Sequence, residues 1–317
     1  MTGFAERFYH WQKPVAIAEI MTKPALIYHP SYVLKLGDHV FPGRKYPLVY
    51  QAMADSGLLN QLSEIRPKPL TAKQLALVHS PEFVHDFLSG IHTYRTYLSE
   101  LPLDADIVRA FLLMGGGTLL AAREALTRGR AINLAGGFHH SYPCHSEGFC
   151  YINDVAIAVR CLMKEELIKR ACIIDLDIHQ GNGTAFIFRQ DDRVFTFSIH
   201  QEDIYPNKEN SDKDIGLRRG VDDQEYLGLL QNALEGLKDS IVGDLIMIVA
   251  GADPLLSDSL GHTLLTPRGL LQRDQMLVGW AEKLGVAIVF TLGGGYGRRI
   301  EDTVEVHLGT AKAMVTG

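Results

Sequence analysis

The sequence has few cysteines. The four that are present, Cys144, Cys150, Cys161 and Cys172, lack zinc-finger spacing in a chain of 317 residues. Disulfide frameworks are typical of short secreted chains, whereas scattered cysteines in a long chain are typical of free thiols in a reducing compartment. We therefore expect free thiols and a cytoplasmic location.

The sequence also lacks a surplus of positive charge and any long apolar run. Lys and Arg total 31 against 37 for Asp and Glu, which gives a net charge of −6. This balance argues against a broad phosphate-binding surface, so we expect no direct nucleic-acid partner. No uninterrupted apolar run approaches the length of a membrane span. The first residues include Glu6, Arg7 and Lys13 without the apolar core of a secretory signal, so we expect neither a membrane protein nor a secreted one.

Composition and pattern predict one α/β domain. Hydrophobic residues make up 46% of the chain and charged residues 21%, as in ordinary globular proteins. Short buried strands alternate with amphipathic helices, which favours a three-layer fold with a largely parallel central sheet and helices on both faces. We expect an added arm at residues 1–23 and a single folded domain at residues 24–317.

The stretch ACIIDLDIHQGNGT, residues 171–184, carries the strongest chemical signal. Its apolar start predicts a buried strand, and alternation along an extended chain places Asp175, Asp177 and His179 on one face at the end of that strand. Carboxylate and imidazole groups hold zinc in hydrolytic sites. A carboxylate at a strand end can also simply cap the next helix, so this motif alone leaves a metal site and a loop open.

Three further motifs are expected at strand ends. His139 and His140 follow a short strand and two glycines, and imidazoles suit general acid–base work, although a polar loop is the alternative. Asp253 stands in GADP and Tyr296 in LGGGYG, each after a predicted strand. Ligands of parallel sheets bind beyond the carboxyl ends of the strands. The motifs should therefore meet at one edge of the sheet.

Two other features are interpreted as structural. His79 and His85 lie in a stretch with helical periodicity, residues 71–89, and are expected to be packing or surface residues. The three glycines at residues 115–117 interrupt a helical pattern and imply either close packing or a local break. A phosphate-binding loop is not favoured there, because no Lys-Ser or Lys-Thr follows and no strand precedes.

The chain resembles the histone deacetylase superfamily of zinc amidohydrolases, most closely its class IV branch and bacterial relatives. The resemblance runs from about Ala25 to the C-terminus, and the motifs GGFHHSYPCHSEGFCYINDVAIA, IIDLDIHQGNG, GADP and LGGGYG occur in the order of the family. The loop YHPSYVLKLGDHVFPGRKY also looks like the opening of class IV members. The resemblance implies an arginase/deacetylase-like catalytic domain at residues 24–317.

The resemblance also assigns roles to individual residues. It implies one catalytic zinc, a pair of tandem histidines, two residues that orient them, and a tyrosine that faces the substrate carbonyl. The implied zinc ligands are Asp177, His179 and Asp253, the tandem histidines are His139 and His140, their orienting residues are Asp175 and Asn182, and the tyrosine is Tyr296. Asn182 stands where class I enzymes carry Asp, so the protonation pattern of the histidines need not follow class I.

Two further sites are implied by the resemblance. Phe149 matches an aromatic wall of the acyl-lysine channel, and Tyr205 is a weaker candidate for the opposite wall; either could instead be core. The family binds a structural monovalent cation such as K⁺. The oxygens implied for it come from Asp175, Asp177, His179, Ser198 and Ile199.

The function that this resemblance implies is zinc-dependent hydrolysis of an N-acyl-lysine amide, with an acyl-lysine protein or peptide, or an acylated small amine, as the partner. An acetylpolyamine hydrolase or another small-molecule amidohydrolase remains open, because the metal site does not report what carries the amine. An arginase-type ureohydrolase would need further carboxylates for a second metal. A non-catalytic protein that binds acylated ligands would be expected to have lost the tyrosine or one of the tandem histidines. This chain retains Tyr296, His139 and His140.

Overall fold

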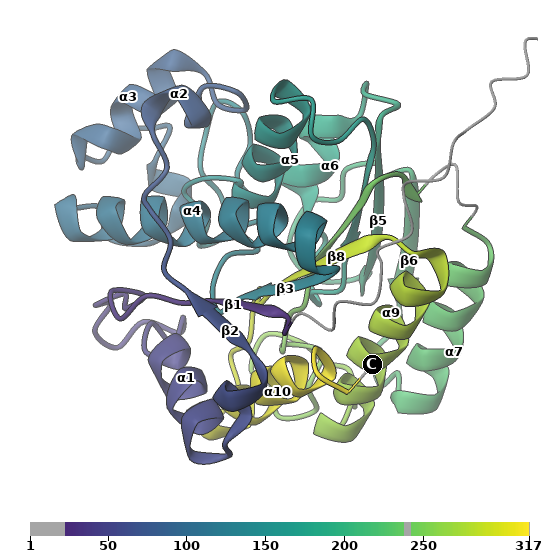
Figure 1. Cartoon of the computed structure of the whole chain (residues 1–317). Helices are drawn as coiled ribbons and strands as arrows, with labels where there is room; N and C mark the ends of the chain where they lie inside the picture. The colour runs from purple at the N-terminus through teal and green to yellow at the C-terminus, as the bar shows by residue number, and fades with distance from the viewer. Residues whose placement is uncertain (1–22, 238–241, 317) are drawn as a thin grey trace, which may run out of the picture.

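The structure is a computed structural model that describes residues 23–237 and 242–316, and an eight-stranded sheet forms its centre (Figure 1). The strands run in the order β2-β1-β3-β8-β7-β4-β5-β6, and every neighbouring pair is parallel. The strand bounds are β1 Ala25–Ile27, β2 Ser63–Ile65, β3 Arg130–Asn133, β4 Ala171–Asp175, β5 Val194–Gln201, β6 Lys213–Leu217, β7 Leu245–Val249 and β8 Ala287–Thr291. The predicted N-terminal arm lies outside the described residues except for Lys23.

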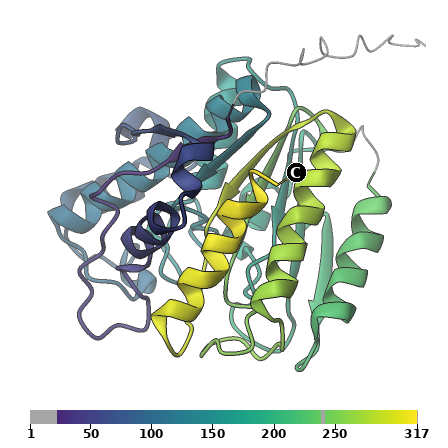
Figure 2. The same ribbon diagram turned by 60° about the horizontal axis from the view of Figure 1, so that its bottom comes forward.

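Helices cover both faces of the sheet. Figure 1 shows α2 to α6 above the sheet, and Figure 2 brings forward α10, α9 and α7, which with α1 cover the other face. The predicted three-layer α/β fold is therefore confirmed. The helix bounds are α1 Lys45–Asp55, α2 Ala72–Leu75, α3 Pro81–Ser89, α4 Ala105–Arg128, α5 Asp154–Lys164, α6 Asn182–Phe188, α7 Asp223–Glu235, α9 Pro267–Leu284 and α10 Ile300–Ala313.

Helix α4 runs without a break through its three glycines, so of the two interpretations close packing is correct. A Cβ atom on Gly116 would overlap the carbonyl oxygen of Lys68, and one on Gly115 would lie 2.7 Å from the side chain of Leu70. The backbone of this neighbouring segment is bonded to the helix, because Leu70 N–H donates to Leu112 O at 2.9 Å. The glycines let a backbone segment lie directly on the helix.

The same helix is long and apolar enough to cross a membrane, and it is the one such helix among the described residues. Length and composition are weak evidence, however, because a core helix passes the same test. Here 72% of its most apolar window is buried inside the protein. Its apolar surface is therefore explained by packing on α5 and β3.

Three elements differ from the sequence-based expectation. The sequences of the edge strands β2 and β6 show no clear strand pattern, and the charged residues 201–220, which include β6, favour a loop instead. Residues 213–216 of β6 alternate between partly buried and exposed, and an edge strand is paired on one side only, so its apolar signal is weak. Residues 153–170 follow an amphipathic helical pattern, but helix α5 ends at Lys164.

The four strands that carry the chemical motifs are consecutive neighbours at the centre of the sheet. In the order β3-β8-β7-β4 they lead into GGFHH, LGGGYG, GADP and DLDIH. The last three of these strands are buried along their whole length. Because all four are parallel, their carboxyl ends meet at one edge, as the sequence predicts.

Candidate active site

The loop after β3 turns sharply and carries the two histidines. Gly136 and Gly137 have φ values of 80° and 78°, in the left-handed region that favours glycine. The buried carboxylate of Asp154 accepts hydrogen bonds from Gly137 N–H at 3.1 Å and Phe138 N–H at 2.7 Å. A Cβ atom on Gly137 would lie 2.9 Å from the backbone of Gly293. The two glycine loops are thus in contact, which holds the histidines beside the loop after β8.

Asp177, His179 and Asp253 form one buried cluster, with their ligand atoms within 4.8 Å of one another. His179 Nδ1 lies 3.2 Å from Asp177 Oδ1 and 3.2 Å from Asp253 Oδ2. Two carboxylates and one imidazole are a donor set found in mononuclear hydrolytic zinc sites. The cluster therefore fits a divalent cation, and the sequence-predicted ligands are brought together as expected.

The charges around this cluster also suit a cation. Burial, followed by the charge of Asp177, raises the pKa of Asp253 to about 8. Within the described part of the chain, both carboxylates form ion pairs only with histidine. The buried ammonium of Lys45 lies nearby, but its Nζ donates to Gly293 O at 2.6 Å and so contacts the loop behind the cluster. Buried carboxylates are costly unless they are paired or bind a metal.

The tandem histidines are buried, and their surroundings differ. His139 Nδ1 lies 2.7 Å from Asp175 Oδ2, and His140 Nδ1 lies 2.8 Å from Asn182 Oδ1. Burial lowers the pKa of His139, but the carboxylates of Asp175 and Asp177 outweigh it and raise that pKa to about 9. Burial lowers the pKa of His140 well below its ordinary value, and the other histidines lower it further. These surroundings favour the protonated form of His139 and the neutral form of His140.

Tyr296 and Phe149 line the pocket in front of the histidines. The ring of Tyr296 lies 6.3 Å from the ring of His179 and 5.8 Å from that of Phe149. Phe149 has a φ of 62°, an uncommon conformation for a bulky residue and one of those that cluster at functional sites. The pocket has a volume of about 20 Å³ and is lined by both rings, both tandem histidines and the glycines of the two loops.

Tyr205 lies at the rim of this site and is not a core residue. Its side chain is 44% exposed, and its ring lies 5.1 Å from the ring of His140. Its hydroxyl donates to Glu147 Oε1 at 2.9 Å. The exposure of Tyr205 argues against the core alternative, and its role as a wall of the acyl-lysine channel remains a prediction.

The residues predicted to bind a monovalent cation lie at the end of β4, in the loop that follows it and in β5. Asp175 at the end of β4 is directly opposite Ser198 in β5. Ser198 Oγ lies 2.9 Å from His200 Nδ1. The K⁺ site through Asp175, Asp177, His179, Ser198 and Ile199 remains a prediction.

The two histidines excluded from the site are placed as predicted. His79 is buried, with Nδ1 3.0 Å from Tyr142 O and Nε2 accepting from Asn153 N–H at 3.0 Å. Both of its ring nitrogens therefore form hydrogen bonds within the protein. His85 is exposed on α3. Neither joins the metal-ligating cluster.

Phe41 and Glu147 are among the residues at this site that the sequence did not single out. Phe41 lines the pocket, and its ring lies 6.1 Å from that of Tyr296. Glu147 accepts a hydrogen bond from Asn182 Nδ2 at 2.9 Å. The polar and aromatic loop that carries Phe41 was the one available signal, whereas nothing local to Glu147 marks its long-range contact.

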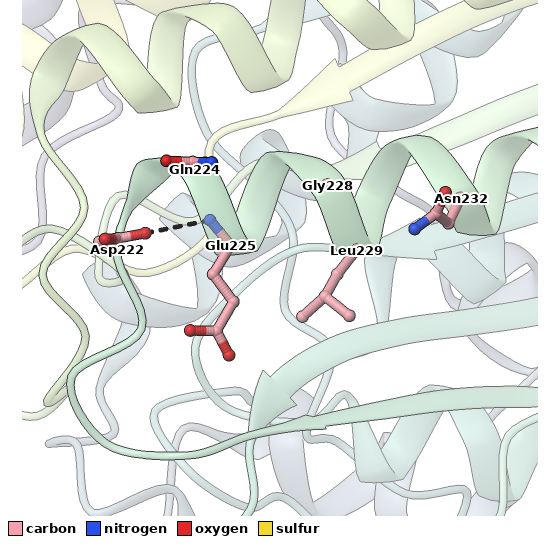
Figure 3. Close-up of a pocket in the computed structure, with 6 residues that line it drawn as sticks. All are labelled: Asp222, Gln224, Glu225, Gly228, Leu229 and Asn232. Carbon is pink, nitrogen blue, oxygen red and sulfur yellow. Dashed lines mark hydrogen bonds between the residues drawn. The ribbon is translucent and has the colours of Figure 1, made fainter.

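A larger hollow of about 430 Å³ lies on the surface along α7 (Figure 3). It is lined by one helix and its cap, where Asp222 accepts from Glu225 N–H at 3.0 Å. None of the four strand-end motifs contributes to it. Its lining residues are Asp222, Gln224, Glu225, Gly228, Leu229 and Asn232. The smaller pocket, not this one, is the candidate active site.

Comparison with known proteins identifies the family. The histone deacetylase domain model matches residues 39–310. An uncharacterized protein of Picosynechococcus sp. is 39% identical over 285 residues, covering 89% of this chain and 95% of its own length. Histone deacetylase 2 of Arabidopsis thaliana is 29% identical, covering 90% of this chain and 79% of its own length. The crystal structure of the HDA15 HD domain aligns with a TM-score of 0.81 and 23% identity over 93% of this chain and 88% of that one, which supports the fold.

These similarities confirm the predicted superfamily, while the placement in class IV remains a prediction. The family model covers most of the residues that the structure describes, including all four strand-end motifs. The protein therefore belongs to the histone deacetylase family of hydrolases.

Proposed function

We propose that this hydrolase is a zinc-dependent deacylase that cleaves the amide of an N-acyl-lysine into free lysine and a carboxylate. The observation that supports it most is the cluster of Asp177, His179 and Asp253, which lies beside two buried histidines and a tyrosine. A zinc ion held there would polarise the amide carbonyl and lower the pKa of a bound water. The other steps fall to side chains of this chain.

His140 is the proposed general base. It is the neutral member of the histidine pair, and the contact between its Nδ1 and Asn182 Oδ1 leaves Nε2 with a free lone pair. Nε2 can therefore take a proton from the attacking water and later deliver it to the leaving amine. His139 keeps its proton through Asp175 and contributes positive charge as negative charge develops on the substrate.

Tyr296 is the proposed donor to the oxyanion. Burial, followed by the charges of Asp177 and Asp253, raises the pKa of its hydroxyl well above the ordinary value, so the phenol keeps its proton. A protonated hydroxyl beside the cluster can donate a hydrogen bond to the oxygen on which charge develops.

The surroundings of the pocket suit the stem of an acylated lysine. Phe149 lines the pocket and the ring of Tyr205 lies 5.1 Å from that of His140, so we propose that these two rings contact the methylene chain of the substrate. Against a ureohydrolase, the ligand cluster within residues 23–237 and 242–316 contains two carboxylates and no further one to bridge a second metal. Against a non-catalytic binding protein, both histidines and Tyr296 are present.

The test is a substrate panel with the purified, zinc-loaded protein. Acetyl-lysine and longer acyl-lysine peptides are compared with acetylpolyamines, and the released amine is measured. We expect kcat/KM to be highest for an acyl-lysine peptide. A higher kcat/KM on acetylpolyamines would indicate that acylated small amines are the substrates. If the protein hydrolysed none of these amides, the proposal would be overturned.

A further inference from the structure

Glu147 lies directly behind the residue that orients His140. We infer that Glu147 is a positioning residue: its carboxylate fixes the side-chain amide of Asn182 and thereby selects the tautomer of His140. The inference rests on the proposed function, in which His140 is the base. Glu147 itself does not line the pocket.

The hydrogen bonds of Asn182 carry the argument. Its Nδ2 donates to Glu147 Oε1 at 2.9 Å, and its Oδ1 lies 2.8 Å from His140 Nδ1. An ionised carboxylate only accepts hydrogen bonds, so only the nitrogen end of the amide can face Glu147. The oxygen end must then face His140, where it can bond only to an N–H group. The proton of neutral His140 is therefore held on Nδ1, and Nε2 is left free to act as the base.

Glu147 is itself held as an ionised acceptor. Tyr205 O–H donates to the same Oε1 at 2.9 Å, and His145 Nε2 lies 3.4 Å from Oε2. Burial raises the pKa of Glu147, but the hydrogen bonds from His145, Asn182 and Tyr205 outweigh it and lower that pKa. One carboxylate thus joins the amide behind the base to the aromatic residue at the rim of the site.

A second hydrogen bond also restrains Asn182, and it limits the effect expected from the loss of Glu147. Gly183 N–H also donates to Asn182 Oδ1, at 3.0 Å, and favours the same orientation of the amide. Without Glu147, however, the buried Nδ2 group would lose its acceptor. The amide could then flip, so that Nδ2 faces a different acceptor. In the flipped amide, Nδ2 would donate to His140 Nδ1 and move the proton to Nε2. General-base catalysis contributes about 100-fold to 10,000-fold, so partial loss of the correct tautomer should cost about tenfold in turnover.

The first experiment compares Glu147→Leu with the wild type, both loaded with zinc and labelled with ¹⁵N-histidine. The shifts of the two ring nitrogens of His140, assigned with a His140→Gln variant, report the tautomer without any substrate. We expect Nδ1–H in the wild type and a mixture with Nε2–H in Glu147→Leu, with a fall of about tenfold in kcat and a smaller change in KM. Glu165→Leu is the matched control, because Glu165 forms a surface ion pair with Arg123 at 2.6 Å, and it should change neither readout.

The second experiment exchanges the two groups. Asn182→Asp alone places two carboxylates side by side and should lower kcat. Adding Glu147→Gln restores a donor–acceptor pair in the reverse direction and lets residue 182 still accept from His140, so we expect kcat to recover to within about threefold of the wild type. If Glu147 only filled space, its replacement by Gln would not restore the kcat of the Asn182→Asp variant.

Two results would overturn the inference: a Glu147→Leu variant with unchanged tautomer and kcat, or a double variant no more active than Asn182→Asp. The failure of the proposed function is distinguishable from either. If the wild type hydrolysed no acylated amine, the nitrogen shifts would still show whether Glu147 sets the tautomer of His140.

Discussion

Tyr296 shows how much of the proposed chemistry depends on one hydroxyl. Its ring is packed against Phe41 and Phe149, and its backbone N–H donates to Asp258 Oδ2 at 2.7 Å. Ring and backbone are therefore held by packing and hydrogen bonding that do not involve the hydroxyl. A substitution that removes only the oxygen separates catalysis from packing.

We expect Tyr296→Phe to lower turnover by about 100-fold to 1,000-fold, because one donor to the oxyanion is lost. Substrate affinity should change much less, and the temperature of unfolding should stay near that of the wild type. Steady-state kinetics on one acyl-lysine peptide and thermal unfolding provide the two measurements. Near-normal turnover would remove Tyr296 from the mechanism, whereas a large fall in unfolding temperature would indicate a packing role instead.

At the scale of elements, the structure depends on close contacts between backbone segments. Helix α4 lies against the segment of Lys68 and Leu70 through its glycines, and the loops that carry Gly137 and Gly293 touch in the same way. Neither contact leaves room for a Cβ atom. The glycines therefore set how closely the layers approach, although glycine lowers the intrinsic stability of a helix by about 1 kcal/mol.

We expect Gly116→Ala to destabilise the protein by about 1–3 kcal/mol, because the new methyl group would overlap the Lys68 carbonyl oxygen and force the backbone apart. Gly279 in α9 is the matched control, since a Cβ atom there would meet nothing within 4 Å. Gly279→Ala should stabilise the protein by about 0.5–1 kcal/mol. Chemical unfolding of the two variants measures both effects; equal shifts of the same sign would contradict the packing argument.

At the scale of the whole molecule, the site exists because four neighbouring parallel strands end at one edge of the sheet. The end of a strand can be recognised from the residues around it. The sequence could therefore place Asp177, His179, Asp253 and the two histidines at this edge of the sheet. The alternating helices and strands likewise predicted the three layers.

Other features could not be predicted because they depend on distant parts of the chain. Strands β2 and β6 are short edge strands with weak apolar patterns. Phe41 reaches the pocket from a loop far from the motifs, and Glu147 finds its partner in Asn182, 35 positions away. Contacts of this kind are fixed by tertiary packing, which no local pattern reports.

The proposed deacylase activity depends on one metal ion held by Asp177, His179 and Asp253. The most direct measurement is the zinc content of the purified protein together with its activity on an acyl-lysine peptide, for the wild type and Asp253→Ala, with circular dichroism to confirm folding. We predict about one zinc per chain in the wild type and the joint loss of zinc and activity in the folded variant. Full activity of Asp253→Ala, or two manganese ions per wild-type chain, would contradict the claim.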